Sequence, residues 1–178
     1  MPPTITPPAQ DEYAPFYAGY VERVAGRDVR AILEGQVEEI RALVAPLSEE
    51  AGAARYEPGK WSVKEVLGHI ADTERVMSYR LLRIARGDAT PLPGFDQDPY
   101  VAAARSDART LESLVAEVEA VRASTLALVG SLGAEEWGRR GVASGREVSA
   151  RALAHIIAGH FAHHAAILGE RYGLGMSA

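Results

Sequence analysis

Four long segments of this chain repeat their apolar residues every three or four positions. They cover about residues 28–44, 63–86 and 106–132, and a fourth segment begins near residue 150. A period near 3.6 residues predicts amphipathic helices, and no segment alternates apolar and polar residues as a half-buried strand does. We therefore expect an all-α fold in which four helices pack as a bundle.

Capping residues predict where these helices begin and end. Ser62 precedes the second segment and Glu65 follows three residues later, which is the spacing of a capping box. Gly87 is placed to end that helix, and Ser149 is placed to begin the fourth. Residues 87–105 contain three prolines, so we expect a long irregular loop, a kind of segment that often has a functional role.

The N-terminal residues 1–27 differ in composition from the rest, with five prolines and four aromatic residues. We expect an extended arm that lies on the domain through its rings, with its first ten residues loosely held. Residues 28–178 are predicted to form a single domain, because the chain has neither an internal repeat nor a linker.

Charge and composition exclude several classes of function. A net charge of −5 without a basic block argues against a nucleic-acid partner. The absence of cysteine excludes disulfides, thiolate ligands and a cysteine nucleophile. The N-terminus lacks the features of a signal peptide, and the uncharged segment 152–169 contains four histidines. We therefore expect a cytoplasmic protein without a membrane partner.

Four of the five histidines fall within residues 155–164 of the fourth predicted helix. At about 100° per residue, His160 and His164 lie within the apolar stripe, one turn apart. His163 lies roughly 90° from the stripe and His155 points almost directly away from it. Imidazoles at positions i and i+4 can bind one metal ion. The alternative is that both are core histidines that hydrogen-bond to other groups. We favour it less, because it would have to apply to two inward-facing histidines one turn apart.

His69 is the remaining histidine and the only candidate for a third imidazole. It flanks the apolar stripe of the second helix, on the same edge as Thr73 and Arg80. If the second and fourth helices are neighbours, His69 completes a three-histidine site with open positions, as in catalytic metal sites. Three imidazoles suit zinc, nickel, copper and iron alike. Such an ion lowers the pKa of bound water to about 7 and can hold a thiol in its deprotonated form.

Each predicted helix also places a polar side chain in or beside its apolar stripe. Gln36 lies near the centre of the first stripe, Glu74 lies roughly 40° from the centre of the second, and Arg122 faces inward in the third. Because an unpaired buried charge costs several kcal/mol, we expect Glu74 and Arg122 to pair with each other or to meet a ligand. If Glu74 and Arg122 pair with each other, their role is structural. With a ligand, Arg122 receives an anionic substrate, and Glu74 orients a histidine or moves a proton.

Other catalytic classes lack their required residues. No glutamate stands three residues before a histidine, so a di-iron carboxylate site is excluded. No glycine-rich phosphate-binding loop is present. A serine triad built on a strand-to-helix turn does not suit an all-α chain.

Two motifs of the chain resemble the DinB-like superfamily, and within it the YfiT-type metal-dependent hydrolases. They are Trp61–Glu74 (WSVKEVLGHIADTE) and His160–His164 (HFAHH). The segment Pro93–Asp98 (PGFDQD) is similar to a loop of one subgroup, and the resemblance covers about residues 30–172.

The resemblance implies a four-helix bundle that binds a divalent metal ion, often zinc or nickel, through three histidines. Here these are His69, His160 and His164, the residues that the helical geometry also selects. His155 and His163 are not part of that ligand pattern, and we expect them at the surface or beside the ligands. The resemblance further implies a homodimer and, for some relatives, a low-molecular-weight thiol as cosubstrate.

The sequence therefore predicts an enzyme whose histidine-bound metal activates water, as in a hydrolase, or a low-molecular-weight thiol, as in an S-transferase. Its substrate would be a small electrophilic molecule. The candidates for proton transfer are Glu74 and Asp72. The candidate substrate contacts are Arg122, Asp96, Gln97 and Tyr100. The alternative is a non-catalytic stress-response protein that binds a metal or a ligand, since no other residue offers a convincing general base.

Overall fold

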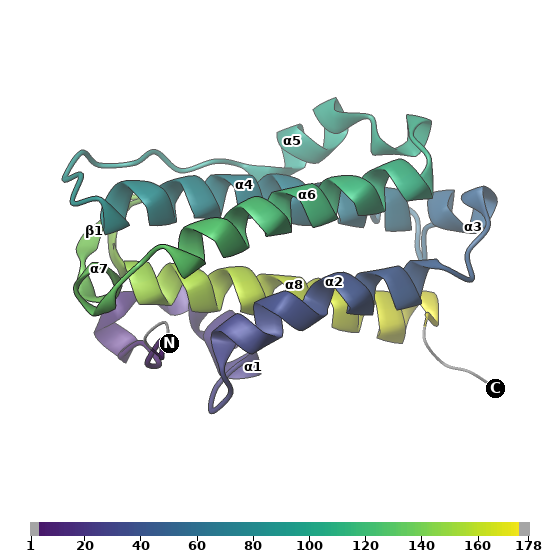
Figure 1. Ribbon diagram of the computed structural model, residues 1–178. Coiled ribbons are helices and arrows are strands. Elements are labelled where there is room, and N and C mark those ends of the chain that lie inside the picture. The colour runs from purple at the N-terminus through teal and green to yellow at the C-terminus, as the bar shows by residue number, and fades with distance from the viewer. Residues whose placement is uncertain (1–3, 175–178) are drawn as a thin grey trace.

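The computed structural model describes residues 4–174, and four long helices packed lengthwise form most of it (Figure 1). The long helices are α2 (Val29–Val44), α4 (Val63–Ala85), α6 (Leu111–Gly130) and α8 (Ala150–Tyr172). They correspond to the four predicted segments, so the all-α bundle is confirmed. None of the helices within residues 4–174 combines the length and apolarity needed to cross a bilayer.

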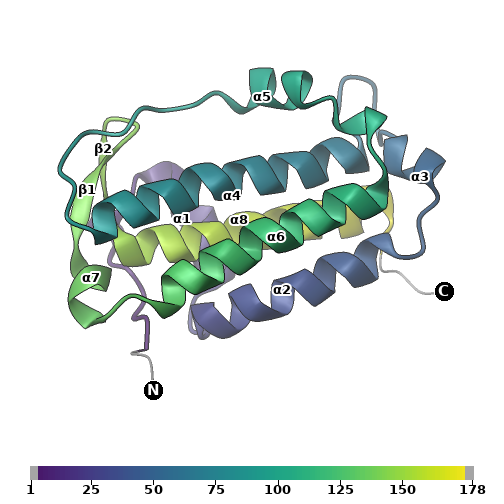
Figure 2. The same cartoon turned by 45° about the horizontal axis from the view of Figure 1, so that its top comes forward.

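The order of packing explains why one connection is long. Both α2 and α4 pack against α6 and α8, so α2 and α4 lie diagonally opposite. The starts of α4 and α6 lie at the same end, where Ser62 Oγ donates a hydrogen bond to Asp107 Oδ1 at 2.5 Å. Because these helices are parallel, the chain between them returns along the outside of the bundle, as Figure 2 shows.

The predicted caps are present at the ends of α4 and α8. Ser62 Oγ accepts from the backbone N–H of Glu65 at 3.0 Å, and Glu65 Oε2 accepts from the N–H of Ser62 at 2.8 Å. Gly87 has a φ of +80°, a conformation that suits glycine just past a helix end. Ser149 Oγ accepts from the N–H of Ala152 at 3.0 Å and so begins α8.

The connection from α4 to α6 is more regular than expected. It contains α5 (Gln97–Ala104) and the 3-10 helix η3 (Ser106–Ala108), so the prediction of an irregular loop over residues 87–105 is wrong at its second half. Asp96 begins α5, because its Oδ1 accepts from the N–H of Asp98 at 3.1 Å. The predicted start of α6 near Ser106 was also early, since Thr110 is the residue that caps α6.

A short hairpin precedes α8, although no strand was expected. Helix α7 (Ala134–Gly138) leads into β1 (Arg140–Ala143), which pairs antiparallel with β2 (Arg146–Ser149). Each strand has four residues, too few for alternation of apolar and polar residues to be detected. The strands are joined through Ser144 and Gly145, whose φ angles of 53° and 72° fit a two-residue hairpin turn.

The N-terminal residues lie along the bundle as an arm, but they include three short helices. These are η1 (Gln10–Glu12), η2 (Pro15–Tyr17) and α1 (Ala18–Arg23), of which α1 packs on α8. Ile5 is buried, so the expectation of a loosely held beginning is wrong at this residue, and residues 1–3 lie outside the described part. Glu12 attaches the arm to the start of α8, because its buried carboxylate accepts hydrogen bonds from Ser149 and Arg151.

A polar layer divides the core of the bundle into two apolar clusters. Arg122 donates from Nε and Nη2 to the two carboxylate oxygens of Glu74, each at 2.8 Å. Its Nη1 donates to Leu33 O and to Gln36 Oε1, also at 2.8 Å, and Gln36 Nε2 donates to Ala158 O at 2.8 Å. Of the two alternatives predicted for Glu74 and Arg122, a mutual pair or a ligand, the structure shows the pair. Each of the four long helices contributes to the layer.

Candidate metal centre

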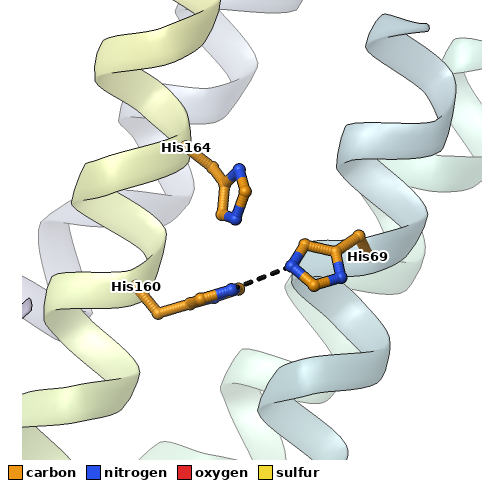
Figure 3. Close-up of side chains that lie close together, drawn as sticks. All are labelled: His69, His160 and His164. Carbon is orange, nitrogen blue, oxygen red and sulfur yellow. Dashed lines mark hydrogen bonds between the residues drawn. The ribbon is translucent and has the colours of Figure 1, made fainter. Parts of the chain in front are cut away.

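Three histidines from two neighbouring helices converge inside the bundle. His69 comes from α4, and His160 and His164 come from α8, one turn apart. One nitrogen of each ring lies within 4.8 Å of the others, and the Nε2 atoms of His69 and His160 are 3.0 Å apart. Figure 3 shows the three rings directed into one space between the two helices. The structure thus brings together the three residues that the helical geometry selected.

Aromatic side chains enclose the three imidazoles, each of which is at most 7% exposed. The ring of Trp61 lies 4.7 Å from that of His69, measured between centroids. The ring of Tyr20, on α1, contacts His160 edge-on at 5.5 Å. Both contacts restrict the histidine rotamers and keep bulk water away from the rings.

Burial keeps the three imidazoles neutral. It lowers the pKa of His69 to about 4, with the charge of His163 adding to the effect. It lowers the pKa of His164 to about 2 and that of His160 well below its usual value, and in both cases neighbouring histidines contribute. At neutral pH the rings therefore carry no proton on at least one nitrogen each, which is the form that binds metal ions.

The environment of the rings fits a divalent metal ion. His164 Nδ1 is buried and has no hydrogen-bond partner among residues 4–174, an uncommon situation for a polar atom in a protein interior. Thr73 Oγ1 lies 3.4 Å from His69 Nδ1, the nitrogen that faces away from His160. Three neutral imidazoles, one of them oriented from behind by a hydroxyl, form a donor set suited to zinc, nickel, copper or iron.

A cavity of about 320 Å³ opens beside His160 and is large enough for a small organic molecule. Its aromatic lining comes from Phe16, Tyr17, Tyr20 and Phe95. Its polar lining comes from Thr73, Asp96, Gln97 and Ser144. Two of the predicted substrate contacts, Asp96 and Gln97, therefore line the cavity. Tyr100 does not line it: its side chain is 47% exposed and packs against Phe95 from outside.

Further hollows lie elsewhere, and two of them are instructive. One of about 170 Å³ reaches His164 from another side and is lined by Trp61, Tyr56 and Tyr172. An open groove of about 740 Å³ between α2 and α6 is larger but contains no histidine. The cavity beside His160 and the small hollow beside His164 therefore both reach the three-histidine group.

The remaining predicted site residues lie apart from the cavity lining. Glu74 and Arg122 bind each other in the polar layer, so the structure gives Arg122 no free edge toward a substrate. Asp72 faces outward and accepts a hydrogen bond from Arg75 at 3.1 Å. Of the carboxylates considered from the sequence, Asp96 is the one that lines the cavity.

The other two histidines of α8 have different surroundings. His163 is partly exposed and its ring lies 5.0 Å from that of His164, beside the expected ligands. His155 is 1% exposed and its Nδ1 lies 2.8 Å from Arg151 O, so the expectation that it is at the surface or beside the ligands is wrong. The physical reason is that the N-terminal arm covers this face of α8, which a helical wheel of one helix cannot indicate.

Several residues of the centre were not identified as such from the sequence. Tyr20 is 140 residues away from His160 in the chain, and only the docking of α1 brings them together. Ser144 belongs to an unexpected hairpin. Thr73 could have been found, because it follows His69 by four residues on a helix and therefore lies one turn further along the same face.

Comparisons with known proteins agree with the fold. No curated protein matches the chain. Among solved structures, YfiT from Bacillus subtilis is similar, with a TM-score of 0.70 and 16% identity over 93% of each chain. That protein is described as a probable metal-dependent hydrolase with an unusual four-helix bundle topology. A family model matches residues 32–168, most of the bundle, and the chain therefore belongs to the DinB superfamily.

Proposed function

We propose that this protein is a metal-dependent enzyme that acts on a small electrophilic molecule, with His69, His160 and His164 as the ligands of a divalent ion. One observation carries the proposal: three buried, neutral imidazoles converge beside a cavity of small-molecule size. A divalent ion held there supplies bound water with a pKa of about 7 or a thiol in its reactive, deprotonated form. Zinc and nickel are the ions we would test first.

The surrounding residues have separate tasks in this proposal. Thr73 orients His69, while Tyr20 and Trp61 restrict the rings and exclude water. The aromatic wall of the cavity binds the apolar part of a substrate. Asp96 replaces Glu74 and Asp72 as our candidate for accepting a proton, because its carboxylate lines the cavity.

Hydrolysis and thiol transfer use the same centre but differ in the second reactant. The hollow beside His164 gives a thiol cosubstrate a route separate from the cavity beside His160. For this reason we include thiol transfer beside hydrolysis in the proposal. A cytoplasmic location and a homodimer are further parts of it, to be tested by fractionation and by light scattering.

Metal binding is the first test. Protein purified without an affinity tag is analysed for bound metals, stripped with a chelator and titrated with Zn²⁺ and with Ni²⁺ by calorimetry. One equivalent should bind, and His69→Ala, His160→Ala and His164→Ala should each weaken binding at least ten-fold. His163→Ala is the matched control, since this residue lies next to the group without belonging to it. Unchanged affinity in the three variants would refute the ligand assignment.

Activity is the second test. The metal-loaded protein is assayed with an activated ester, and with an aryl halide in the presence of low-molecular-weight thiols. Turnover should disappear on chelation and return when the metal is restored. Tight metal binding without turnover of any substrate would instead favour the non-catalytic metal-binding protein.

A further inference from the structure

Arg80 is a buried cation without an anionic partner in the described part of the chain. It lies on α4 and is 3% exposed. Its Nη2 donates to Pro93 O at 2.7 Å and to Ser144 Oγ at 3.0 Å, and its Nη1 lies 3.6 Å from Met77 Sδ. These acceptors are all neutral. Among residues 4–174, no ion pair includes Arg80, whereas the other buried arginine, Arg122, binds Glu74 through two hydrogen bonds.

Two acidic residues in this region have other partners. Glu147 and Arg80 both line a small hollow, but Glu147 Oε1 binds Arg140 Nη1 at 2.6 Å. Asp96 is exposed and uses Oδ1 to cap α5. The desolvation of a charge costs several kcal/mol unless a counter-charge compensates for it. The structure therefore leaves a positive charge to be neutralised by something other than the described residues.

The guanidinium of Arg80 lies behind the wall at one end of the cavity beside His160 and is not itself part of the lining. Three residues that it contacts, Met77, Phe95 and Ser144, line that cavity. The guanidinium carbon is 5.8 Å from the centroid of the Phe95 ring, within range of a cation–π contact. Arg80 thus forms part of the surroundings of the cavity, at the end where α4 approaches the hairpin.

The same face of α4 connects Arg80 to the three-histidine group. Thr73, Met77 and Arg80 follow His69 by four, eight and eleven residues, and Thr73 and Met77 line the cavity between them. Eleven residues correspond to roughly 16 Å along a helix axis. Long side chains on a helix lean toward its N-terminus, so the guanidinium reaches back toward His69 and shortens this distance. The cavity thus extends from the histidines toward a cation.

The hairpin turn holds the guanidinium in place. Ser144 has a φ of 53°, in the left-handed region where asparagine, aspartate and glycine are preferred in such turns. Its backbone N–H donates to Leu92 O at 3.0 Å, which fixes the turn against the α4–α5 connection. A residue keeps such an unfavourable backbone conformation where the surrounding structure enforces it. Its consequence here is that the Ser144 hydroxyl accepts from Arg80 at 3.0 Å.

We propose that the uncompensated charge of Arg80 makes the adjacent end of this cavity an anion-binding subsite and that the substrate is a small organic acid. Its carboxylate binds at that end, its apolar body contacts the aromatic wall, and its reacting end faces the three histidines. Because Nη2 of Arg80 already donates to Pro93 and Ser144, the attraction is one of charge, which is strong in a partly dehydrated pocket. The assignment of the reacting end rests on the proposed function, while the anion subsite itself does not.

Paired probes test the subsite. 4-Phenylbutanoate and 4-phenylbutanamide share size and shape and differ in charge, so their affinities are compared by calorimetry on the full-length protein, both zinc-loaded and metal-free. We expect the carboxylate to bind at least ten-fold more tightly in both forms. Arg80→Gln should remove this preference, and Ser144→Ala should reduce it. Arg86→Gln, which alters the exposed arginine at the C-cap of the same helix, should leave it unchanged.

The outcomes separate the two proposals. Equal affinities for acid and amide in the unaltered protein overturn the subsite, as does a preference that survives in Arg80→Gln. If Arg80→Gln fails to fold, the preference of the unaltered protein and its reduction in Ser144→Ala decide. Failure to bind Zn²⁺ with a preserved, Arg80-dependent preference for the acid would refute the metal centre and support the subsite. Zinc binding without that preference would support the metal centre and refute the subsite.

Discussion

The backbone oxygen of Tyr20 occupies the place where a side chain at Gly159 would lie. A Cβ added to Gly159 would come within 2.0 Å of this oxygen, so α1 can pack on α8 only because position 159 is glycine. The close approach sets the ring of Tyr20 against His160, the next residue along α8. The absence of a side chain at position 159 therefore allows the N-terminal arm to cover the histidine group.

Substituting Gly159 tests this relationship. Gly159→Ala should displace α1 and lower the free energy of unfolding by about 1–3 kcal/mol, as overpacking does. It should also weaken zinc binding, because Tyr20 no longer restricts His160. Gly35→Ala is the matched control: this helical glycine has no atom near its added Cβ, and alanine should stabilise α2 by about 0.5–1 kcal/mol. Urea unfolding and zinc titration measure both effects. A stable Gly159→Ala with normal zinc affinity would contradict the argument.

Metal binding should stabilise the folded chain measurably. An ion that binds the native state alone at one hundred times its dissociation constant adds about 2.7 kcal/mol. We therefore expect excess Zn²⁺ to raise the free energy of unfolding of the metal-free protein by roughly that amount, and His69→Ala to abolish the increase. The measurement is urea unfolding with and without the ion. The same increase in His163→Ala serves as the control, and an equal increase in His69→Ala would show that zinc binds elsewhere.

The histidine group could be predicted from the sequence because its geometry is local. Two of its members are one turn apart on one helix, and the third lies on the edge of another helix, so the 3.6-residue period selects all three. Tyr20 and the burial of His155 could not be predicted, since both depend on where the N-terminal arm docks. The role of Arg80 depends on Ser144 and thus on a hairpin with strands too short to recognise. The sequence placed Arg80 on the edge of His69 and Thr73, but gave no sign that it would lack a carboxylate.

The pair of Glu74 and Arg122 should govern stability without affecting metal binding. Removing one partner of a buried ion pair leaves a charge uncompensated and costs about 3–5 kcal/mol. We expect this loss in Glu74→Gln, with zinc affinity within a factor of two of the unaltered protein. The double variant Glu74→Leu/Arg122→Met removes both charges and should recover part of the lost stability. The recovery should be partial, because the hydrogen bonds from Arg122 to Gln36 and Leu33 are lost as well. Unfolding in urea and zinc calorimetry provide the two readouts. A Glu74→Gln variant with normal stability and lost activity would instead make Glu74 a participant in the reaction.

The buried carboxylate of Glu12 should make the attachment of the arm sensitive to acid. Burial alone would raise its pKa, but hydrogen bonds from Arg151, Ser149 and the Ala9 N–H outweigh burial and lower the pKa from 4.5 to about 2. A carboxyl with a lowered pKa in the folded state contributes stability at pH values above 4.5, and this contribution is lost as the pH falls from 4.5 to about 2. Protonation removes the negative charge that holds the Arg151 guanidinium.

The neutral variant Glu12→Gln tests this dependence on pH. It should lower the free energy of unfolding at pH 7 and flatten its decline between pH 4.5 and 2, because glutamine does not titrate in that window. At pH 7 we expect a loss of about 3–5 kcal/mol, the cost of breaking a buried ion pair from one side. Urea unfolding at a series of pH values measures the slope, with the exposed Glu34→Gln as control. An unchanged slope in Glu12→Gln would mean that other carboxylates cause the acid sensitivity. If protonation of Glu12 releases the arm, tryptic cleavage after Arg23 should accelerate in Glu12→Gln at pH 7 and not in the control.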